Sequence, residues 1–565
     1  MKKLLTLTFL LFLTSSLSRA DIIANSQDWR DVYQVMIYSY YSNKTFHFVN
    51  NLGEAKILSM TLSKTKSQKI FESSKKSVVK DLKRFLQLRG FSNLKSETFE
   101  DYKTLQFELY RRVREKIEGF VVIHDDFGYD AISVTPYALR KRYWVLFYNK
   151  DIRDDIISLL NKNYDKPVMF YGEFLDRPWT EIENYYMIID EKTFFGNNLK
   201  LVKILLNEIN TSRSWLVACD GRYLGEGYLL QAMPIVFVEE DVKELIELMR
   251  ESGVNLLEVI GPENVQFGQR VRDLSNRTIG VIIRTGRTFT GSPPLRGLQF
   301  VLKQLPVTKP YADIKIEKVF YDPDSKRLVF IIKNDGNIAT SYHLSGIGVF
   351  YGDREYFPPF SSRLHLLPSG IKIALPVYME LNETPDKVEV LMIYGYEFPL
   401  KDTQQNLYNV TERKILINSS IKLLGAYYNY YDRKLYLQIK NDGEKPAYAF
   451  AEIYDFNLMG LNRTIFFGPT KLSPGEVKLL GFDVYLNSTD ISLNSVLNIT
   501  LFFGDSMELT IEKVDYSVPI EIKKPMLTGL LIAIKANALY IMLSMVIAIL
   551  VITLFLFKRW GVKKV

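Results

Sequence analysis

The sequence predicts a multidomain protein: an α/β head of three repeated units, two all-β domains and one transmembrane helix. Three observations predict this fold class. The N-terminal half alternates short apolar strands with helical patterns, as in parallel sheets. After residue 310 the helical periodicity ends, and short alternating strands follow, separated by turns rich in Asn, Asp, Gly and Pro. Near the C-terminus, one apolar run is long enough to cross a bilayer.

The first 20 residues have the pattern of a secretory signal peptide. Two lysines after Met1 precede an apolar run from Leu4 to Leu13, and a small-residue stretch ends at Ala20. The run is shorter than the roughly 20 residues that span a bilayer. We therefore expect export and cleavage after Ala20, rather than a first transmembrane helix.

The apolar run from Ala536 to Phe557 (536–557) is the predicted transmembrane helix. It is bracketed by Lys535 and Lys558, and a helix of roughly 22 residues is about 33 Å long, which matches the hydrocarbon core. The basic tail, 558–565, is expected in the cytoplasm because positive charge stays on that side. The expected localisation is the cell membrane, with a single pass, the N-terminal ectodomain outside and membrane lipid as the partner of the C-terminal helix.

The composition is that of a globular protein, with 47% hydrophobic and 24% charged residues. The net charge of +8 is too modest to indicate a nucleic-acid partner. Cys219 is the single cysteine, so no disulfide can form within the chain. Because eukaryotic ectodomains of this size usually carry several disulfides, we expect a prokaryotic surface protein.

The exported part of the chain also contains N-glycosylation tripeptides, which crowd between residues 380 and 500. A glycosylated surface protein without disulfides is expected in an archaeal envelope. The candidate acceptors are Asn43, Asn210, Asn276, Asn382, Asn409, Asn418, Asn462, Asn487 and Asn498.

One phrase, a strand followed by an acidic turn and a helix, recurs three times in the head. It occupies residues 21–41, 120–139 and 215–232. In the second and third copies an amphipathic helix and a strand ending in glycine follow, whereas the first copy has a basic helix near residues 79–88 and no clear third strand. Repetition at this length indicates related units that bury their apolar faces against one another. The expected repeats are residues 21–118, 119–213 and 214–305.

This phrase, best seen in residues 127–138, resembles the cell wall binding repeat 2 family, which occurs as three tandem copies in bacterial surface-layer and wall-associated proteins. The resemblance covers roughly residues 21 to 300 and extends to the later order of strand, helix and strand-Gly. It implies a flavodoxin-like fold for each repeat and non-covalent attachment to an anionic envelope polymer. Two family features, an Arg-Tyr phrase ahead of each copy and a Gly-Gly after the third strand, are not evident in this sequence.

A second internal repeat lies in the β-rich part. Residues 314–336 match residues 421–443 without a gap, and both end in Asn-Asp-Gly, which we expect to supply the positive-φ residues of a tight turn. The two domains, 311–412 and 418–522, have alternating strands and frequent turns, typical of immunoglobulin-like sandwiches. They resemble the CARDB-like adhesion modules of prokaryotic surface proteins, which implies a spacer between a membrane tether and a working head.

Acidic residues follow the first strand of each repeat and are the candidate ligand-binding residues. Open α/β sheets bind ligands at the C-terminal ends of their strands, and paired carboxylates there could act as acid and base or hold a cation. Alternatively, an acid near a helix N-terminus simply stabilises the helix, by about 0.3–1 kcal/mol. Repetition in all three copies favours this structural interpretation, because an active site is usually assembled once. The candidates are Asp28, Asp31, Asp125, Asp126, Asp130, Asp220 and Glu226.

The sequence contains no other catalytic or metal-ligating pattern. The histidines are scattered, so no neighbouring set indicates zinc, and no P-loop, G-x-S-x-G or H-E-x-x-H is present. Cys219 follows a strand, where a lone cysteine is more often a small buried hydrophobe than a nucleophile. We expect no metal, no cofactor and no catalytic residue.

These observations predict a membrane-anchored binding or scaffold protein of the cell envelope. Its α/β head would contact an envelope glycan, a surface-layer protein or another protein partner. One alternative is an ectoenzyme that acts on envelope glycans through an acidic pair. Another is an accessory or receptor subunit of a membrane complex.

Overall fold

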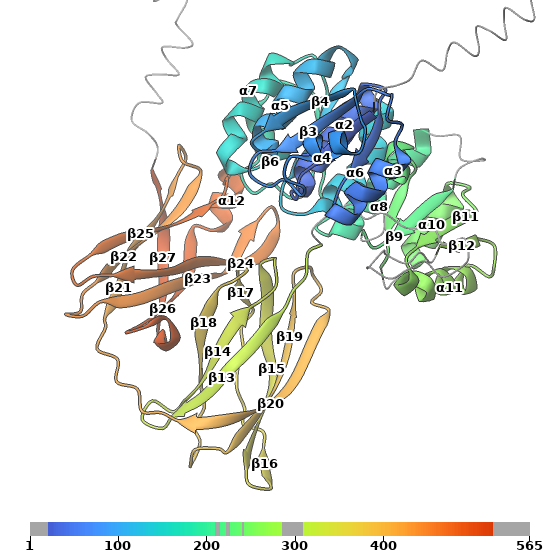
Figure 1. Ribbon diagram of the computed structural model, residues 1–565. Helices are drawn as coiled ribbons and strands as arrows, with labels where there is room; N and C mark the ends of the chain where they lie inside the picture. The colour runs from blue at the N-terminus through green and yellow to red at the C-terminus, as the bar shows by residue number, and fades with distance from the viewer. Residues whose placement is uncertain (1–20, 209–214, 222–225, 240–241, 285–308, 524–565) are drawn as a thin grey trace, which may run out of the picture. The chain divides into compact units, whose positions relative to one another are not determined.

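The computed structural model describes residues 21–208, 215–221, 226–239, 242–284 and 309–523. The chain divides into two compact units at Pro310 and Tyr311 (Figure 1). The predicted signal peptide, transmembrane helix and basic tail lie outside the described residues, as does Asn210. Within those ranges, no helix is long and apolar enough to cross a bilayer.

The first unit contains three four-stranded parallel sheets, which confirms the predicted α/β parallel-sheet units. All three sheets have the same order, in which the second strand lies at one edge and is followed by the first, third and fourth strands. The strands are β1 (Asp21–Asn25), β2 (Thr45–Phe48), β3 (Gln68–Ser73) and β4 (Leu94–Phe99); β5 (Gly119–His124), β6 (Tyr143–Tyr148), β7 (Val168–Tyr171) and β8 (Tyr186–Ile189); and β9 (Leu216–Cys219), β10 (Ile235–Phe237), β11 (Leu256–Ile260) and β12 (Gly280–Arg284).

Helices connect these strands. The helices of the first repeat have side-chain caps: Asp28, Asn51, Asp81 and Asp101 each accept a backbone N–H of the helix that they precede. The helices are α2 (Trp29–Tyr41), α3 (Leu52–Thr61), α4 (Leu82–Leu88), α5 (Tyr102–Val113), α6 (Gly128–Lys141), α7 (Arg153–Lys162), α8 (Phe194–Glu208), α9 (Glu226–Leu230), α10 (Lys243–Glu251) and α11 (Val265–Leu274).

The first repeat has a complete sheet, so the expectation of no clear third strand in this copy is wrong. The third strand, β3, lies at Gln68–Ser73 and pairs with both β1 and β4. Its buried residues include Ile70 and Phe71, but charged Lys69 and Glu72 interrupt the apolar pattern. A short strand with such interruptions is difficult to distinguish from a loop by periodicity alone.

The first helices of the three repeats, α2, α6 and α9, each contact the other two. Buried hydrogen bonds cross from one repeat to the next at this point. The Tyr33 hydroxyl lies 2.7 Å from that of Thr135, and the Tyr129 hydroxyl donates to the carbonyl oxygen of Asp220. One continuous apolar cluster therefore includes residues of all three repeats.

The second unit is built from β-rich sheets, as predicted. Its first sheet runs in the order β16-β15-β19-β20-β13-β14-β18, with β17 on β15, and its second runs β24-β23-β26-β27-β21-β22-β25. The strands are β13 (Ile314–Asp322), β14 (Arg327–Asn334), β15 (Thr340–Tyr351), β16 (Arg354–Tyr356), β17 (His365–Leu367), β18 (Lys372–Tyr378), β19 (Lys387–Gly395), β20 (Asp402–Glu412), β21 (Ile421–Asn429), β22 (Lys434–Asn441), β23 (Ala447–Leu458), β24 (Leu461–Leu472), β25 (Val477–Asp483), β26 (Val496–Gly504) and β27 (Glu512–Lys523).

The last strand of each β domain pairs with two neighbours of opposite direction. β20 is antiparallel to β19 over most of its length and then parallel to β13 at its end. β27 likewise is antiparallel to β26 and ends parallel to β21. In the first domain this arrangement brings apolar side chains of β13, β14, β15, β18 and β19 into one core.

The two Asn-Asp-Gly phrases make the same contacts in their two domains, but they do not form the predicted turn. None of the described residues in either phrase has a positive φ, so the expected positive-φ turn is wrong. Instead, the side chain of Asn334 is buried, donates to the carbonyl oxygens of Ile338 and Leu367, and accepts from the N–H of Gly336. Asn441 makes the corresponding bonds in the second domain.

The β domains of the second unit share a buried joint. Phe450, Phe466 and Phe502 of the second domain join the apolar core of the first. Beside them, the fully buried carboxylate of Glu452 binds Nδ1 of His365 at 2.7 Å and the N–H of Leu366 at 3.3 Å.

Candidate functional site

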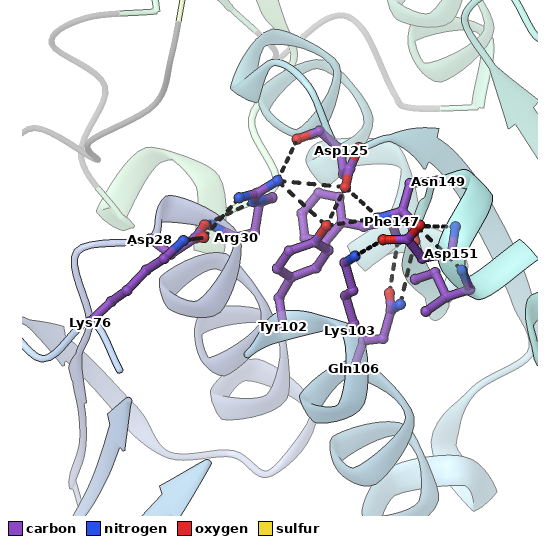
Figure 2. A network of polar contacts seen from close by, with 11 residues as sticks. Asp28, Arg30, Lys76, Tyr102, Lys103, Gln106, Asp125, Phe147, Asn149 and Asp151 are labelled. Atoms are coloured by element: carbon purple, nitrogen blue, oxygen red, sulfur yellow. Dashed lines mark hydrogen bonds and ion pairs between the residues drawn. The ribbon is translucent and has the colours of Figure 1, made fainter. Parts of the chain in front are cut away.

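Acidic side chains gather where the first strands of repeats one and two end. Asp28 follows β1 and Asp125 follows β5, and both bind Arg30, which comes from the first turn of α2 (Figure 2). This is the edge of a parallel sheet at which α/β proteins bind ligands. The structure thus brings two of the sequence-predicted acids together, around a cation that belongs to the chain itself.

Asp28 caps α2 and is also the most strongly paired acid of the cluster. Its carboxylate binds Nη2 of Arg30 at 2.8 Å and Nζ of Lys76 at 2.9 Å. Burial opposes its ionisation, but the hydrogen bonds from the two cations prevail and lower the pKa of Asp28 to about 2. Asp28 is therefore a permanent anion with its charge neutralised inside the protein.

Asp125 is held by groups from both repeats. Its Oδ2 accepts a 2.7 Å hydrogen bond from Nδ2 of Asn149 and a second bond from the hydroxyl of Tyr102, and it lies 3.5 Å from Nη1 of Arg30. The guanidinium of Arg30 also stacks on the Tyr102 ring, 4.3 Å from its centre. These contacts cross the boundary between repeats, so the cluster fastens one repeat to the next (Figure 2).

Asp31 and Asp130 occupy equivalent places, each the third residue of its helix, and both are buried. Burial raises the pKa of Asp31 to about 7 even though the Ser26 hydroxyl donates to it at 2.6 Å. Within the described ranges, Oδ1 of Asp31 has no hydrogen-bond partner. Burial and the neighbouring charge of Asp126 raise the pKa of Asp130 to about 8. Among the described residues, neither acid forms direct ion pairs like those of Asp28. The charges of Lys76 and Arg30 lower the pKa of Asp31, but burial outweighs them, so both acids favour the protonated form.

The remaining candidates are less tightly grouped. Asp126 is exposed, and Asp220 is buried after β9. Glu226 is the first residue of α9, and its side chain lies outside what the structure describes. Cys219 is buried, and burial raises the pKa of its thiol to about 12, so this cysteine lacks the low-pKa thiolate of a nucleophile.

The arrangement is suited to holding repeats together more than to chemistry. Asp28 and Asp125 are already bound by Arg30, Lys76, Tyr102 and Asn149. In the part of the chain that the structure describes, no group of three or more His, Cys, Asp or Glu side chains is placed to hold a metal ion. The pairing that comes nearest to an acid–base couple is the exposed Asp126 with the buried Asp130.

Four members of the network were not predicted from the sequence. Arg30 lies inside the recurring phrase, and its position between two acids was an available signal. Lys76, Tyr102 and Asn149 lie far from Asp28 or Asp125 along the chain, and only the folded topology brings them there.

The candidate glycosylation sites that the structure describes lie at the surface. Asn487 is half-buried and caps a short helix, α12 (Ser488–Leu493), through its side chain. The exposed asparagines are Asn43, Asn276, Asn382, Asn409, Asn418, Asn462 and Asn498.

Comparison with known proteins gives no family. No family model matches the chain, and no curated protein matches it. Among solved structures, Cwp8 from Clostridium difficile is 17% identical over 46% of this chain and 48% of its own, with a TM-score of 0.37, so this chain spans about half the length of that protein.

Two further structural matches cover 38% of the chain. A protein of unknown function from Porphyromonas gingivalis W83 is 12% identical over 38% of this chain and 99% of its own, with a TM-score of 0.14. The CsuC-CsuE chaperone–tip adhesion subunit complex of Acinetobacter baumannii is 12% identical over 38% of this chain and 100% of its own, also with a TM-score of 0.14. Scores this low support no inference about what this chain does.

Proposed function

We propose that the chain is a membrane-anchored binding or scaffold protein of the cell surface, whose α/β head contacts a surface-layer, glycan or protein partner. The observation that carries the proposal is the placement of the glycosylation tripeptides. Every acceptor asparagine within the described ranges reaches the surface, in both units of the chain. This placement fits a chain that folds outside the cell, behind the predicted signal peptide and ahead of the predicted membrane helix.

We infer that the three units of the head are flavodoxin-like repeats of the cell wall binding repeat 2 type. Their common strand order corresponds to the first four strands of the flavodoxin-like order. The mutual contacts of α2, α6 and α9 agree with a set of three repeats that is complete only when all three are present.

For the second unit, we infer two immunoglobulin-like sandwiches that act as a spacer. Support comes from the two similar strand orders and from the apolar core that opposing strands of the first domain enclose. The joint around Glu452 keeps the two β domains from moving independently, which suits a spacer that has to hold a head at a fixed height.

A binding role agrees better with the head than catalysis does, because the acids Asp28 and Asp125 are already committed to Arg30. One observation favours the alternative of an envelope-directed ectoenzyme: Asp130 has a pKa of about 8 and lies near the exposed Asp126. The variants Asp126→Asn and Asp130→Asn separate the two functions. An enzyme loses turnover of envelope glycan in these variants, whereas a binding protein retains its partner.

The first test of the proposal is protease treatment of intact cells that carry the full chain with an epitope at its C-terminus. We expect the ectodomain to be digested and a short membrane-protected fragment with the epitope to remain. A cytoplasmic protein serves as the control for cell integrity. If the chain remains full-length while a known surface protein is cleaved, the proposed location is wrong.

The second test is retention of the ectodomain, residues 21–523, by isolated envelope fractions. We expect the ectodomain to sediment with the envelope and to be released when the head is competed away by excess soluble ectodomain. Separate treatment of the envelope with protease and with glycosidase then identifies the partner as protein or glycan. An ectodomain that stays in solution with every fraction contradicts the binding role.

A further inference from the structure

The joint between the β domains leaves an open groove of about 510 Å³ on the sheet of the second domain. We propose that this groove is a carbohydrate-binding site. It is occupied by the first sugars of an N-linked glycan that is attached at its rim to Asn498 or Asn462. The inference rests on the proposed function, because only an exported chain receives such a glycan. The lining residues that carry the argument are Arg363, Tyr454, Asn462, Asn498, Asp515 and Tyr516.

The two acceptor asparagines reach the groove from different strands. Asn498 lies on β26, where it pairs with Tyr454 of the neighbouring strand β23. Asn462 lies on β24, on the other side of β23, and its Oδ1 accepts a 3.0 Å hydrogen bond from Asn457. Both side chains are exposed. Two acceptor sites that are distant in sequence therefore open onto the same hollow.

The lining has the chemistry that binds sugars. Arg363, from the first β domain, lies over the ring of Tyr454 at 5.0 Å and is 3.9 Å from the Asp515 carboxylate. Guanidinium, carboxylate and hydroxyl groups together can donate to and accept from the hydroxyls of a sugar, and tyrosine rings offer apolar faces. The volume lies within the range of about 300–1,000 Å³ that small-molecule sites occupy.

The threonines of both acceptor tripeptides form hydrogen bonds within the folded β domains. The Thr464 hydroxyl donates to the carbonyl oxygen of Leu364 at 2.8 Å, across the joint, and the Thr500 hydroxyl donates to Asp515. Thr500 is buried. A transferase therefore cannot reach the Asn498 tripeptide once β26 and β27 have paired, so the sugar has to be attached before the domain folds. The attached chain then lies beside the joint as it closes.

Glycopeptide mass spectrometry of the protein purified from its own cells is the first experiment. We expect sugar on Asn498 or Asn462. Bare asparagines at both positions, with sugar on Asn409 of β20, overturn the groove proposal and leave the surface location intact. Bare asparagines at every site in a chain that protease cannot reach overturn both.

The second experiment measures how fast an amidase releases each glycan from the folded protein. Because each additional hydrogen bond that a seated sugar makes contributes a modest free energy, we expect release from the groove to be slower than release from Asn409 by about fivefold or more. Arg363→Ala should remove most of that difference, and Arg363→Lys, which keeps the charge, should remove less. Equal release from the groove and from Asn409 in the unaltered protein overturns the proposal without reference to any variant.

A third arm distinguishes an attached sugar from one that arrives from outside. In the double variant Asn462→Gln/Asn498→Gln, amides of β26 and β27 should exchange hydrogen faster than in the glycosylated protein. Adding soluble oligosaccharide from the envelope at millimolar concentration should restore little protection. Full restoration would show that the groove binds a sugar of another molecule, which contradicts the assignment to the chain's own glycan.

Discussion

At the scale of single residues, the recurring strand–acid–helix phrase contains carboxyl groups whose pKa values are shifted in opposite directions. The pKa of Asp28 is about 2, whereas that of Asp31 is about 7 and that of Asp130 about 8. All three are buried, so burial alone does not separate them. The difference is the pair of cations, Arg30 and Lys76, that binds Asp28.

Replacing Asp28 tests how much of its contribution is capping and how much is charge. Asp28→Ala removes both, and we expect the free energy of unfolding of the head to fall by about 2–4 kcal/mol. Asp28→Asn keeps a capping side chain and should lose less, because only the ion pairs disappear. Trp29, Trp144, Trp179 and Trp215 lie in the head and the β domains contain no tryptophan, so denaturation followed by tryptophan fluorescence reports on the head. Equal stability of both variants and the unaltered protein would contradict this role.

The pH dependence of the head follows from Asp130. An unfolded aspartate has a pKa of about 3.9, and the folded pKa is about 8. Between these values the folded state keeps a proton that the unfolded state releases, so stability falls as pH rises from about 4 to 8. Asp130→Asn should make the head more stable at pH 8, by an amount on the order of a few kcal/mol, and should change little at pH 4.

The matched control for this change is Asp154→Asn, because the Asp154 side chain is 96% exposed on the same repeat. Unfolding curves between pH 4 and 8 should give a flatter profile for Asp130→Asn only. If the two variants show the same profile as the unaltered protein, Asp130 is not protonated in the folded head.

At the scale of elements, the sequence predicted strands that are fully buried and missed those that are not. The apolar strands β5, β7 and β9 stand out because every or nearly every residue is buried. The fourth strands β4, β8 and β12 were not predicted, since they lie at sheet edges and most of their residues are exposed or half-buried. An edge strand of this kind carries too few apolar positions for a pattern to appear.

The Asn-Asp-Gly phrases show that a repeat can be detected while its physical reason is missed. The expectation was a turn with positive φ, but glycine is needed for space: a Cβ on Gly336 would lie 2.5 Å from the carbonyl oxygen of Tyr311. Asn334, two residues before it, donates to one carbonyl oxygen of the following loop and to one of β17. The local sequence indicates neither the close approach of Gly336 to the Tyr311 backbone nor the buried carbonyl groups.

Asn334→Ala and Asn441→Ala should each destabilise their β domain by about 2–4 kcal/mol, because buried carbonyl groups lose their donor. Calorimetry of the second unit provides the measurement. Asp335→Asn and Asp442→Asn are the controls, since these neighbours lie in the same phrases and their side chains form ion pairs with lysines at the surface. A loss of similar size in the controls would mean that the turn as a whole, and not the buried amide, stabilises the domain.

At the scale of the whole molecule, the sequence predicted where the candidate acids lie but not which side chains bind them. The strand–acid–helix phrase located Asp28 and Asp125 correctly after the first strands, because a local pattern determines where a strand ends. The contact of Lys76 with Asp28 depends on how the first repeat folds, and the contact of Tyr102 with Asp125 depends on which surfaces of two repeats meet. That information is distributed over the packing of many side chains and is not carried by any single segment.

The joint between the β domains is the second feature that the sequence did not predict. Glu452 is fully buried, and its partners are His365 and Leu366 of the other domain and Tyr454 of its own strand. Burial and the Glu452 carboxylate raise the pKa of Tyr454, so its hydroxyl remains a donor. The acid of one domain is thus satisfied by donors from both.

Glu452→Gln should uncouple the domains, since the amide keeps the size of the side chain but lacks the charge that these donors bind. We expect the unaltered second unit to unfold in a single calorimetric transition. In the variant, its free energy of unfolding should fall by about 2–4 kcal/mol and the transition should separate into two. Glu444→Gln, at an exposed position, is the control. A single transition at the original temperature would show that the phenylalanine contacts alone hold the joint.

The pairing of the terminal strands has a mechanical consequence for each β domain. In each β domain the first and last strands are parallel neighbours, β13 with β20 and β21 with β27. When the two ends of such a domain are pulled apart, tension runs along both strands in opposite senses and loads their hydrogen bonds in shear, all at once, instead of unzipping them one by one. Each domain should therefore resist a pulling force better than a hairpin of equal area, and this resistance would matter under the proposed membrane anchorage.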